Sequence, residues 1–360
     1  MTDLRRTCLK QYYQSYSPVW KEIPVAHPGD EVLVRRIAQE LAEMAGFSRH
    51  RVAKASLIVS ELATNIIKHT SGGTIRINLA FLNRIPFISI ASFDTGPGIQ
   101  SIKNASKNGT SSTDTLGTGL GAIRRLSDKM NICSTDHSYP CPNLKNSWKT
   151  IIACQIWGDN QSIPIVANGQ DFSSLLRPME GAQICGDGIH VASNPFCTRF
   201  TIMDGTGRGG GAAEAICRAM NILNDLPVGL DPEKIIELMS YQLSETQGMS
   251  SGILEIDHQT QHIYFSFNGS IKARIYIDDI IYSADQRTKS ATPHIKSIDI
   301  SNARHVLAIV HTDGLTQLPE IDPKDIAKDI PAMIWCQTLF RNGNLKDDIA
   351  LLTWTWKKQT

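Results

Sequence analysis

Residues 51–69 read RVAKASLIVSELATNIIKH, and their apolar positions recur at the three- and four-residue spacing of an amphipathic helix. The stretch EVLVRRIAQELAEMA, between Asp30 and Ala45, has the same periodicity and predicts a second helix. Two β-rich runs follow, TIRINLAFL and FISIASFD, and the second ends at Asp94. The first third of the chain is therefore predicted to hold two amphipathic helices and a pair of adjacent strands.

Glu61 and Asn65 are four residues apart in the segment ELATN, so both side chains project from one face of the predicted helix. A carboxamide oxygen is a hard, neutral ligand for Mg²⁺ beside phosphate oxygens, and a carboxylate can orient or deprotonate an attacking hydroxyl. The alternative is an ordinary solvated helix face, which this short segment does not exclude by itself.

The segment DTGPG follows the second strand and brings Asp94, Gly96 and Gly98 together. The Asp94 carboxylate is suited to accept a hydrogen bond from an exocyclic amine such as that of adenine. Glycines at the next positions would let the backbone approach a flat base closely. A plain turn is the alternative, because Asp, Gly and Pro are the usual turn residues.

A second glycine-rich run precedes the periodic stretch AIRRLSDKM, which predicts a helix; the run consists of Gly117, Thr118, Gly119, Leu120 and Gly121. Successive backbone N–H groups at the start of a helix form a cradle for phosphates. The polar residues 99–116 before it predict a flexible lid. The order of helix, strand end, polar lid and glycine run favours an ATP site over three unrelated local features.

Composition limits the classes of function. The 360 residues exceed one ordinary domain and predict two, and 41% apolar and 20% charged residues are typical of globular chains. The net charge of +1 provides no overall field for nucleic acid or anionic lipid, so neither is expected as a partner.

The first thirty residues lack the apolar core of a secretion signal, and no apolar run approaches ~18 residues, so we expect a cytoplasmic protein without a membrane partner. Eight cysteines occur singly, without a CxxC pair or zinc spacing. We expect them to be reduced thiols, most of them buried.

The second half has a different pattern, with the boundary near residue 160. An irregular stretch over about 158–181 predicts a linker or an entry strand. Beyond it, six strand-like runs surround helical stretches at 211–223 and 232–247, which predicts an α+β domain with a β-sandwich core.

Four acidic sites recur in this half beside glycine or another acid: Asp187, Asp204, Asp313 and the pair Asp347 and Asp348. Aspartates at strand ends can converge on one edge of a sandwich, where hard divalent cations take carboxylate and carbonyl oxygens. Two such ions would activate water against a phosphate ester. The alternative is a set of hairpin turns, for which Asp-Gly is a common signal.

The first set of motifs resembles the GHKL ATP-binding fold, and within it the bacterial anti-sigma-factor and stressosome switch kinases. ELATNIIKH is similar to the N box of that family, FDTGPGI to its first glycine box and LGTGLGAIRRLSD to its second. The resemblance covers about residues 20 to 157. It implies that Asn65 binds Mg²⁺, Glu61 is the catalytic base and Asp94 recognises adenine, with residues 99–121 as the lid over the triphosphate.

The second half resembles PPM-type serine/threonine phosphatases, in their compact bacterial SpoIIE-type branch, over about residues 164 to 357. GDG, MDGTGRGGGAAEA, HTDG and LKDDIALL carry the resemblance. It implies two Mg²⁺ or Mn²⁺ ions, with ligands Asp187, Asp204, the Gly205 carbonyl, Asp313 and Asp347. One departure is Arg208, which stands where the family usually has histidine and can neither accept a proton nor ligate a metal.

Together the resemblances imply an α+β chain of two domains. Residues 1–158 would form a GHKL (Bergerat) α/β sandwich and residues 181–360 a PPM-type αββα sandwich, with a linker or entry strand over 159–180. The leading hypothesis is a bifunctional partner-switching protein that phosphorylates and dephosphorylates a serine or threonine of a STAS-domain antagonist.

Two alternatives stay open. The first domain could be an ATP-dependent module that sequesters a sigma factor or another regulator, and the second a degenerate phosphatase that acts as a scaffold, as Arg208 suggests. The sequence leaves open a homodimer, the identity of the partner and the choice between Mg²⁺ and Mn²⁺.

Overall fold

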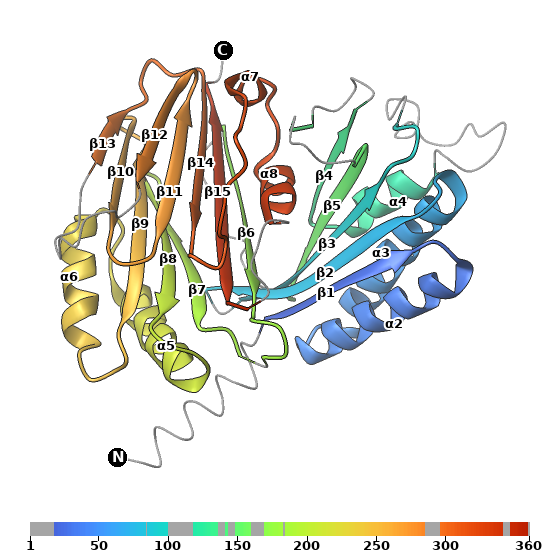
Figure 1. The fold of residues 1–360 in the computed structure, drawn as a ribbon, viewed down its shortest axis with the longest axis horizontal. Helices are drawn as coiled ribbons and strands as arrows, with labels where there is room; N and C mark the ends of the chain where they lie inside the picture. Colours follow the sequence, from blue (N-terminus) through green and yellow to red (C-terminus); the bar gives the residue numbers. More distant parts are fainter. Residues whose placement is uncertain are drawn as a thin grey trace. The chain divides into compact units, whose positions relative to one another are not determined.

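The computed structural model describes residues 18–83, 85–99, 118–135, 141–142, 148–159, 169–182, 184–284, 296–340 and 346–358. It divides into two compact units, one built mainly from residues 19–162 and the other from residues 163–360. Both units mix helices with antiparallel strands (Figure 1). The boundaries predicted at residues 158 and 181 stay predictions.

The N-terminal unit is a five-stranded sheet with helices on one face (Figure 1). The sheet order is β1-β2-β3-β5-β4, and β3 and β4 both pair antiparallel with β5. The strands are β1 (Val19–Val25), β2 (Gly73–Leu82), β3 (Ile85–Asp94), β4 (Lys129–Ser134) and β5 (Thr150–Trp157), and the helices are α2 (Pro28–Met44), α3 (Arg49–His69) and α4 (Thr118–Leu126).

Helix α3 is central to this unit because it packs against α2, α4 and the sheet. It begins at Ser48, whose hydroxyl accepts a hydrogen bond from the Arg51 N–H at 3.3 Å and so satisfies one of the free donors of the first turn. Its buried stripe includes Ile58, Leu62 and Ile66, which lie in the core between helices and sheet. The helical periodicity of residues 51–69 is thus confirmed.

The helix predicted for AIRRLSDKM is partly wrong. Helix α4 starts earlier, inside the glycine run, and ends at Leu126, after which Lys129 begins β4. The reason is tertiary: the Asp128 N–H donates to the Gln155 carbonyl, and the Asp128 carboxylate accepts the Trp157 N–H at 2.8 Å. These contacts with β5 bind the chain to the sheet just where the sequence continues a helical pattern.

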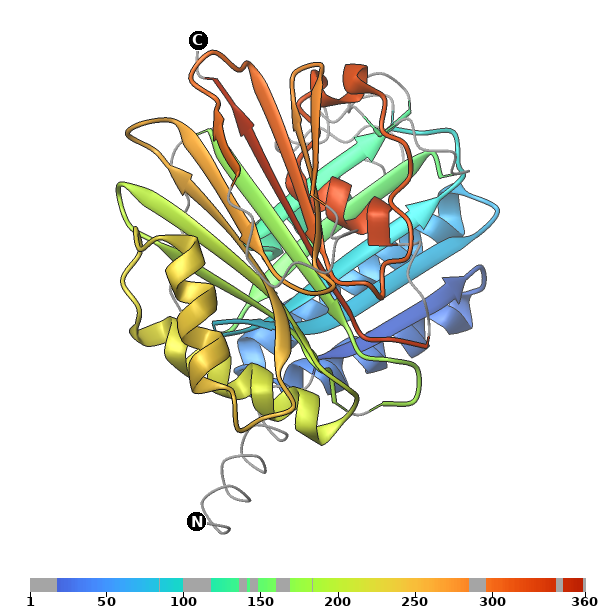
Figure 2. The ribbon, with the colours of Figure 1, turned by 60° about the vertical axis from the view of Figure 1, so that its left-hand side comes forward.

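The C-terminal unit contains two five-stranded sheets, ordered β13-β10-β9-β8-β7 and β12-β11-β14-β15-β6. Helices α5 (Gly210–Asp225) and α6 (Pro232–Gln242) pack on the first sheet, and α8 (Ala332–Leu339) packs on the second (Figures 1 and 2). The two sheets contact each other through β15 with β7 and β8. The unit therefore combines two antiparallel sheets, each of which has at least one helix packed on it.

The strands of this unit include several that the sequence pattern did not distinguish. The first sheet contains β7 (Asp187–Ser193), β8 (Cys197–Gly205), β9 (Met249–Asp257), β10 (His262–Phe267) and β13 (Lys296–Asp299). The second contains β6 (Gln170–Arg177), β11 (Lys272–Ile277), β12 (Ile280–Ala284), β14 (His305–His311) and β15 (Ile349–Lys357), with the short helix α7 (Pro323–Ile326) against β14. Strand β6 lies within the stretch predicted as a linker or entry strand.

The expectation that all cysteines are reduced is wrong for one pair. Cys133 and Cys141 form a disulfide, with their Cα atoms 5.0 Å apart. Spacing along the sequence does not reveal this pair, because bonding depends on the distance between Cα atoms in the fold. Cys154, Cys185 and Cys336 are buried free thiols, as expected.

The part of the chain that the structure describes contains no helix with both the length and the apolar character needed to cross a bilayer.

Two leucines of helix α3 differ in burial and allow a controlled test of its packing. Leu62 is 0% exposed in the core, whereas Leu57 of the same helix is 52% exposed. Leu62→Ala should lower the free energy of unfolding by about 2–5 kcal/mol because it leaves a cavity, and Leu57→Ala should change it by less than about 0.5 kcal/mol. Calorimetric unfolding of both variants checks this; equal losses would contradict the central packing of α3.

Candidate functional site

The start of α4 lies directly against the two polar residues predicted on α3. A Cβ atom built on Gly119 would lie 2.9 Å from the Glu61 Oε2 atom and 3.5 Å from the Asn65 Oδ1 atom. Real Cβ atoms essentially never approach a neighbour as closely as the first of these distances. The fold thus brings three of the predicted residues to one place, and the absence of a side chain at Gly119 permits this approach.

The backbone of this glycine run forms the first turn of α4, while one of its side chains anchors the helix. Leu120 is buried in the core between α3 and the sheet, so only its backbone is available to a ligand. The N–H groups of a first helical turn have no partner within the helix and favour negative charge. Gly121 follows in the same helix, whereas Gly117 and the Thr118 side chain lie outside the described residues.

A second group of residues lies at the end of β3. The Asp94 carboxylate accepts the Gly96 N–H at 2.9 Å and is bonded by the Thr150 side chain. Burial raises the pKa of Asp94, and these two hydrogen bonds act in the opposite direction. A buried carboxylate beside a hydroxyl suits recognition of an amine.

Thr150 was missed by the sequence reasoning. It lies opposite Asp94 in the β3–β5 pairing and is buried. The signal was present in the strand WKTIIACQIW, whose first residues align with the end of FISIASFD once the two runs are paired in antiparallel register.

The loop after Asp94 is held against the end of α3. A Cβ atom on Gly96 would lie 2.7 Å from the Thr70 Cγ2 atom, and Gly98 has φ +90°, which favours glycine. Thr70 caps the C-terminus of α3 and follows Asn65 by five residues, or about 7.5 Å along the helix axis at 1.5 Å per residue. One helix therefore places the Glu61 group and the Asp94 group at a fixed separation.

In the C-terminal unit, two predicted acids face each other on adjacent strands. Asp187 and Asp204 are directly paired across β7 and β8. The Thr312 hydroxyl donates to Asp187 at 2.7 Å, and the Ser270 hydroxyl donates to Asp204. Burial, and then the Asp204 charge, raise the pKa of Asp187 well above its usual range; burial is also the main reason that the pKa of Asp204 rises to about 6.

The remaining acids lie within electrostatic reach of this pair. Burial and then Asp347 raise the pKa of Asp313, and the charges of Asp313 and Asp347 contribute to the raised pKa of Asp204. Asp348 differs from them because its two carboxylate oxygens accept the N–H groups of Met179 and Gly186, each at 2.7 Å. It joins the two loops that contain Met179 and Gly186.

The region of Asp187, Asp204, Asp313, Asp347 and Asp348 forms an acidic edge, in which two glycines lie directly against neighbouring backbone. A Cβ atom on Gly314 would lie 2.0 Å from the Asp348 carbonyl oxygen, and one on Gly205 would lie 2.6 Å from the Ala212 carbonyl oxygen. Both neighbours are backbone, so no side chain can be accommodated without a backbone shift. Gly205 also donates its N–H to the Gly186 carbonyl, which joins the loop of Asp187 to that of Asp204.

The donor set fits a divalent cation. Buried, mutually repelling carboxylates are unfavourable without a positive charge, and hard oxygen donors are what Mg²⁺ and Mn²⁺ bind. Among the described residues, however, no three acidic, histidine or cysteine side chains are close enough together to hold one ion. Ligation by Asp187, Asp204, Gly205, Asp313 and Asp347 therefore stays a prediction.

Arg208 lies in the glycine-rich loop between β8 and α5. It is exposed, and the glycines on either side, Gly207 and Gly209, have φ of +90° and +68°. Burial raises the pKa of Asp348, and the charge of Arg208 acts against that rise, so the guanidinium is within electrostatic reach of the acidic edge.

Residues 25–138 match the family model described as a histidine kinase-like ATPase domain. The chain is 31% identical over 105 residues to the serine/threonine-protein kinase RsbT of Bacillus subtilis, and this match spans 29% of the chain and 79% of RsbT. The chain belongs to the histidine kinase-like ATPase family.

The match to this ATPase family lies wholly in the first half of the chain. Similar solved structures include RsbX in complex with magnesium, at 18% identity and a TM-score of 0.48, covering 54% of this chain and 98% of RsbX. Another is the PP2C phosphatase domain, with a fragment of the regulatory domain, of the cell fate determinant SpoIIE from Bacillus subtilis; the match covers 76% of this chain and 80% of that one, at 15% identity and a TM-score of 0.40.

The buried acids of the acidic edge should make the thermal stability of the protein depend on pH. The pKa of Asp204 rises from 3.8 to about 6 on folding, so the folded state binds the proton more tightly, and this group destabilises the fold as pH rises through 6. Asp204→Asn is neutral at every pH. Without divalent metal, the variant should therefore unfold at a higher temperature than the wild type at pH 7.5, and at nearly the same temperature at pH 3.5, below the unfolded pKa of 3.8.

Calorimetry in the presence of a chelator measures this difference. Adding Mn²⁺ at pH 7.5 should then raise the unfolding temperature of the wild type more than that of Asp204→Asn. A pH-independent difference between the two proteins would contradict the buried, raised carboxyl at Asp204.

Proposed function

We propose that this chain is a bifunctional partner-switching protein: an ATP-dependent serine/threonine kinase in the N-terminal unit and a metal-dependent phosphoserine/threonine phosphatase in the C-terminal unit. The finer architectures that go with this proposal are a Bergerat α/β sandwich and a PPM-type αββα sandwich. The observation that carries the kinase part is the approach of Gly119 to Glu61 and Asn65, in a chain related to a serine/threonine kinase.

In the kinase step, Glu61 would accept the proton of the attacking serine or threonine hydroxyl as its oxygen bonds to the γ-phosphorus of ATP, while the bond from that phosphorus to the β-phosphate oxygen breaks and ADP leaves. Asn65 would hold Mg²⁺ through its amide oxygen, and bound Mg²⁺ would neutralise phosphate charge. The N–H groups at Gly119 and along the first turn of α4 would bind phosphate oxygens. Asp94 and Thr150 would orient the adenine, with Gly96 and Gly98 as the close-approach backbone.

In the phosphatase step, Asp187, Asp204, the Gly205 carbonyl, Asp313 and Asp347 would hold two Mg²⁺ or Mn²⁺ ions. When bound, such ions supply an activated water and polarise the phosphoryl oxygens. The chain itself orients the acids: Thr312 fixes Asp187, Ser270 fixes Asp204, and Asp348 ties together the loops that contain Met179 and Gly186.

The proposed substrate of both steps is a STAS-domain antagonist, and the proposed basis is the resemblance of both halves to stress and sporulation regulators. A kinase and a phosphatase in one chain would set the phosphorylation level of one residue in both directions. ATP is then a phosphate donor to a protein.

Arg208 favours a second candidate, in which the C-terminal unit is a scaffold and the N-terminal unit sequesters its partner while ATP is bound. A guanidinium cannot take over proton transfer from histidine, although its fork can bind a phosphoryl group.

Glu61→Ala distinguishes these candidates. If Glu61 is the base, phosphate transfer from radiolabelled ATP to a STAS-domain protein isolated from the source cell should fall by about 100-fold or more. The dissociation constant for ATP should change by less than about threefold, because the carboxylate does not hold the nucleotide. Glu40→Ala on α2, where the side chain is 61% exposed, is the matched control and should keep full transfer.

Quantitative autoradiography and ATP titration give the two readouts. Two results together would favour sequestration and reject the kinase. The wild type would transfer no phosphate, and the Glu61→Ala protein would still regulate its partner normally.

A further inference from the structure

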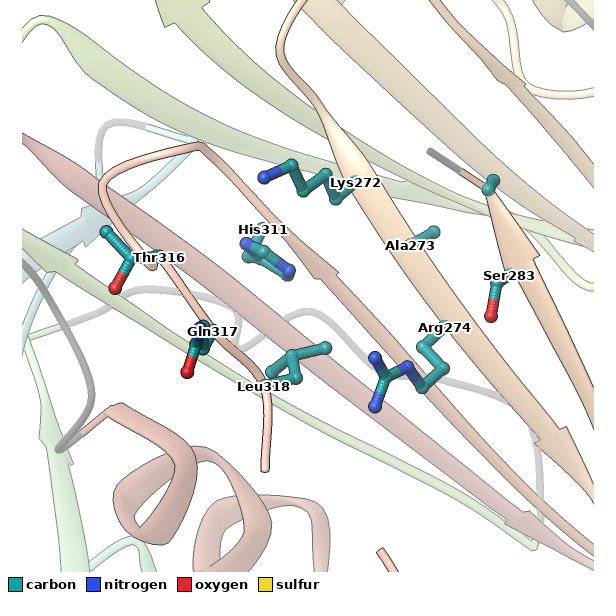
Figure 3. A pocket seen from close by; sticks show the side chains of 9 residues that line it. Lys272, Ala273, Arg274, Ser283, His311, Thr316, Gln317 and Leu318 are labelled. Carbon is teal, nitrogen blue, oxygen red and sulfur yellow. The ribbon is translucent and has the colours of Figure 1, made fainter. Parts of the chain in front are cut away.

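An open groove of about 440 Å³ lies on the second sheet of the C-terminal unit, over β11, β12 and β14. Figure 3 shows side chains from these strands facing the segment after β14. The polar ones that matter here are Lys272, Arg274, Ser283, His311, Thr316 and Gln317. Neither the proposed kinase step nor the acidic edge uses this groove.

The strand register places the groove on an outer face of the unit. Arg274 pairs with Ile309, and Ile309 pairs with Thr353, so all three side chains point to the same side of the sheet. The Thr353 hydroxyl donates to the Ala332 carbonyl of α8 at 2.7 Å. The groove therefore lies on the α8 side of this sheet, and α8 itself packs on β6 and β15.

Two cations give the groove its charge. Lys272 and Arg274 are two residues apart on β11, so they share one face at a separation of about 7 Å. Across the described residues, no carboxylate lies within ion-pair distance of either side chain. The Arg274 guanidinium is held by neutral partners at 3.4 Å, the Tyr276 hydroxyl and the Pro319 carbonyl, which orient it without neutralising it.

The groove adjoins the acidic edge. Burial raises the pKa of Asp313, and the Lys272 charge acts against that rise, so Lys272 is within electrostatic reach of Asp313. Thr316 follows Asp313 by only three residues, after a tight turn in which the Leu315 N–H donates to the Thr312 carbonyl. A peptide whose phosphoserine lies at the acidic edge would thus reach the groove within a few residues of that phosphoserine.

We propose that this groove binds acidic side chains of the phosphoprotein substrate, two to four residues from the phosphoserine. The proposal rests on the phosphatase function proposed above and specifies its substrate class. An extended peptide advances about 3.3 Å per residue and places alternate side chains on one face, which matches the spacing of Lys272 and Arg274. Carboxylates that enter the groove would pair with both cations, and the Gln317 amide would supply further hydrogen bonds.

The test compares two synthetic phosphoserine peptides, one with glutamates two and four residues from the phosphoserine and one with glutamines there. With full-length protein and Mn²⁺, kcat/KM should be about fivefold higher for the acidic peptide, as expected for partly exposed charge pairs. Arg274→Gln and Lys272→Gln should bring this ratio close to one, whereas Arg274→Lys should keep most of it. Lys234→Gln, on helix α6 away from the groove, is the control and should keep the whole ratio.

A wild-type ratio near one would overturn the proposal. So would a loss of kcat/KM in Arg274→Gln that is equal for both peptides, because the cations would then act on the phosphoryl group common to them.

Failure of the phosphatase is a separate outcome. If the wild type hydrolyses neither the peptides nor p-nitrophenyl phosphate, the proposed activity fails, and fluorescence anisotropy with the intact labelled peptides tests the groove alone. Tighter binding of the acidic peptide by about fivefold, lost in Arg274→Gln, would support the groove; equal binding of both peptides would overturn it.

Discussion

The close approach of α4 to α3 at Gly119 is the contact on which the N-terminal site depends. Two features combine there: Leu120 anchors the new helix in the core, and the neighbouring glycine lets its backbone reach Glu61 and Asn65. A helix start that is anchored in this way, beside a carboxylate and a carboxamide on α3, holds the N–H groups of its first turn in fixed positions. Most of the geometry of this site therefore comes from packing.

The candidate site of the C-terminal unit consists mainly of negatively charged side chains. Its fold directs several carboxylates to one edge, with Asp187 and Asp204 opposite each other on neighbouring strands, where like charges are destabilising. The raised pKa values of these acids measure that conflict. Hydroxyl donors and the tie through Asp348 hold the acids in place nonetheless. A divalent cation would remove the repulsion, and this is the physical reason to predict a metal at this edge.

The sequence predicts those parts of the fold that local periodicity determines. Helix α3 follows from its apolar spacing, and the strand that ends at Asp94 follows from its β-rich run and turn. The end of α4 at Leu126 could not be predicted, because bonds between Asp128 and β5 override a helical pattern. Pairings across distant segments, such as Asp94 with Thr150 and Cys133 with Cys141, appear only once register and loop return are known. The groove beside Lys272 could not be predicted from the sequence for the same reason.

The proposed control of one residue in both directions can be measured in a phosphorylation time course on a single partner. Full-length protein, a limiting amount of Mg-ATP, Mn²⁺ and the captured STAS-domain partner would be followed by mass spectrometry of the modified serine. With the wild type, we expect phosphate on that serine to rise and then fall as ATP is consumed; with Asp313→Ala, it should rise and stay. A wild-type phosphoserine that persists after ATP is exhausted, or a partner that is never modified, would contradict the claim.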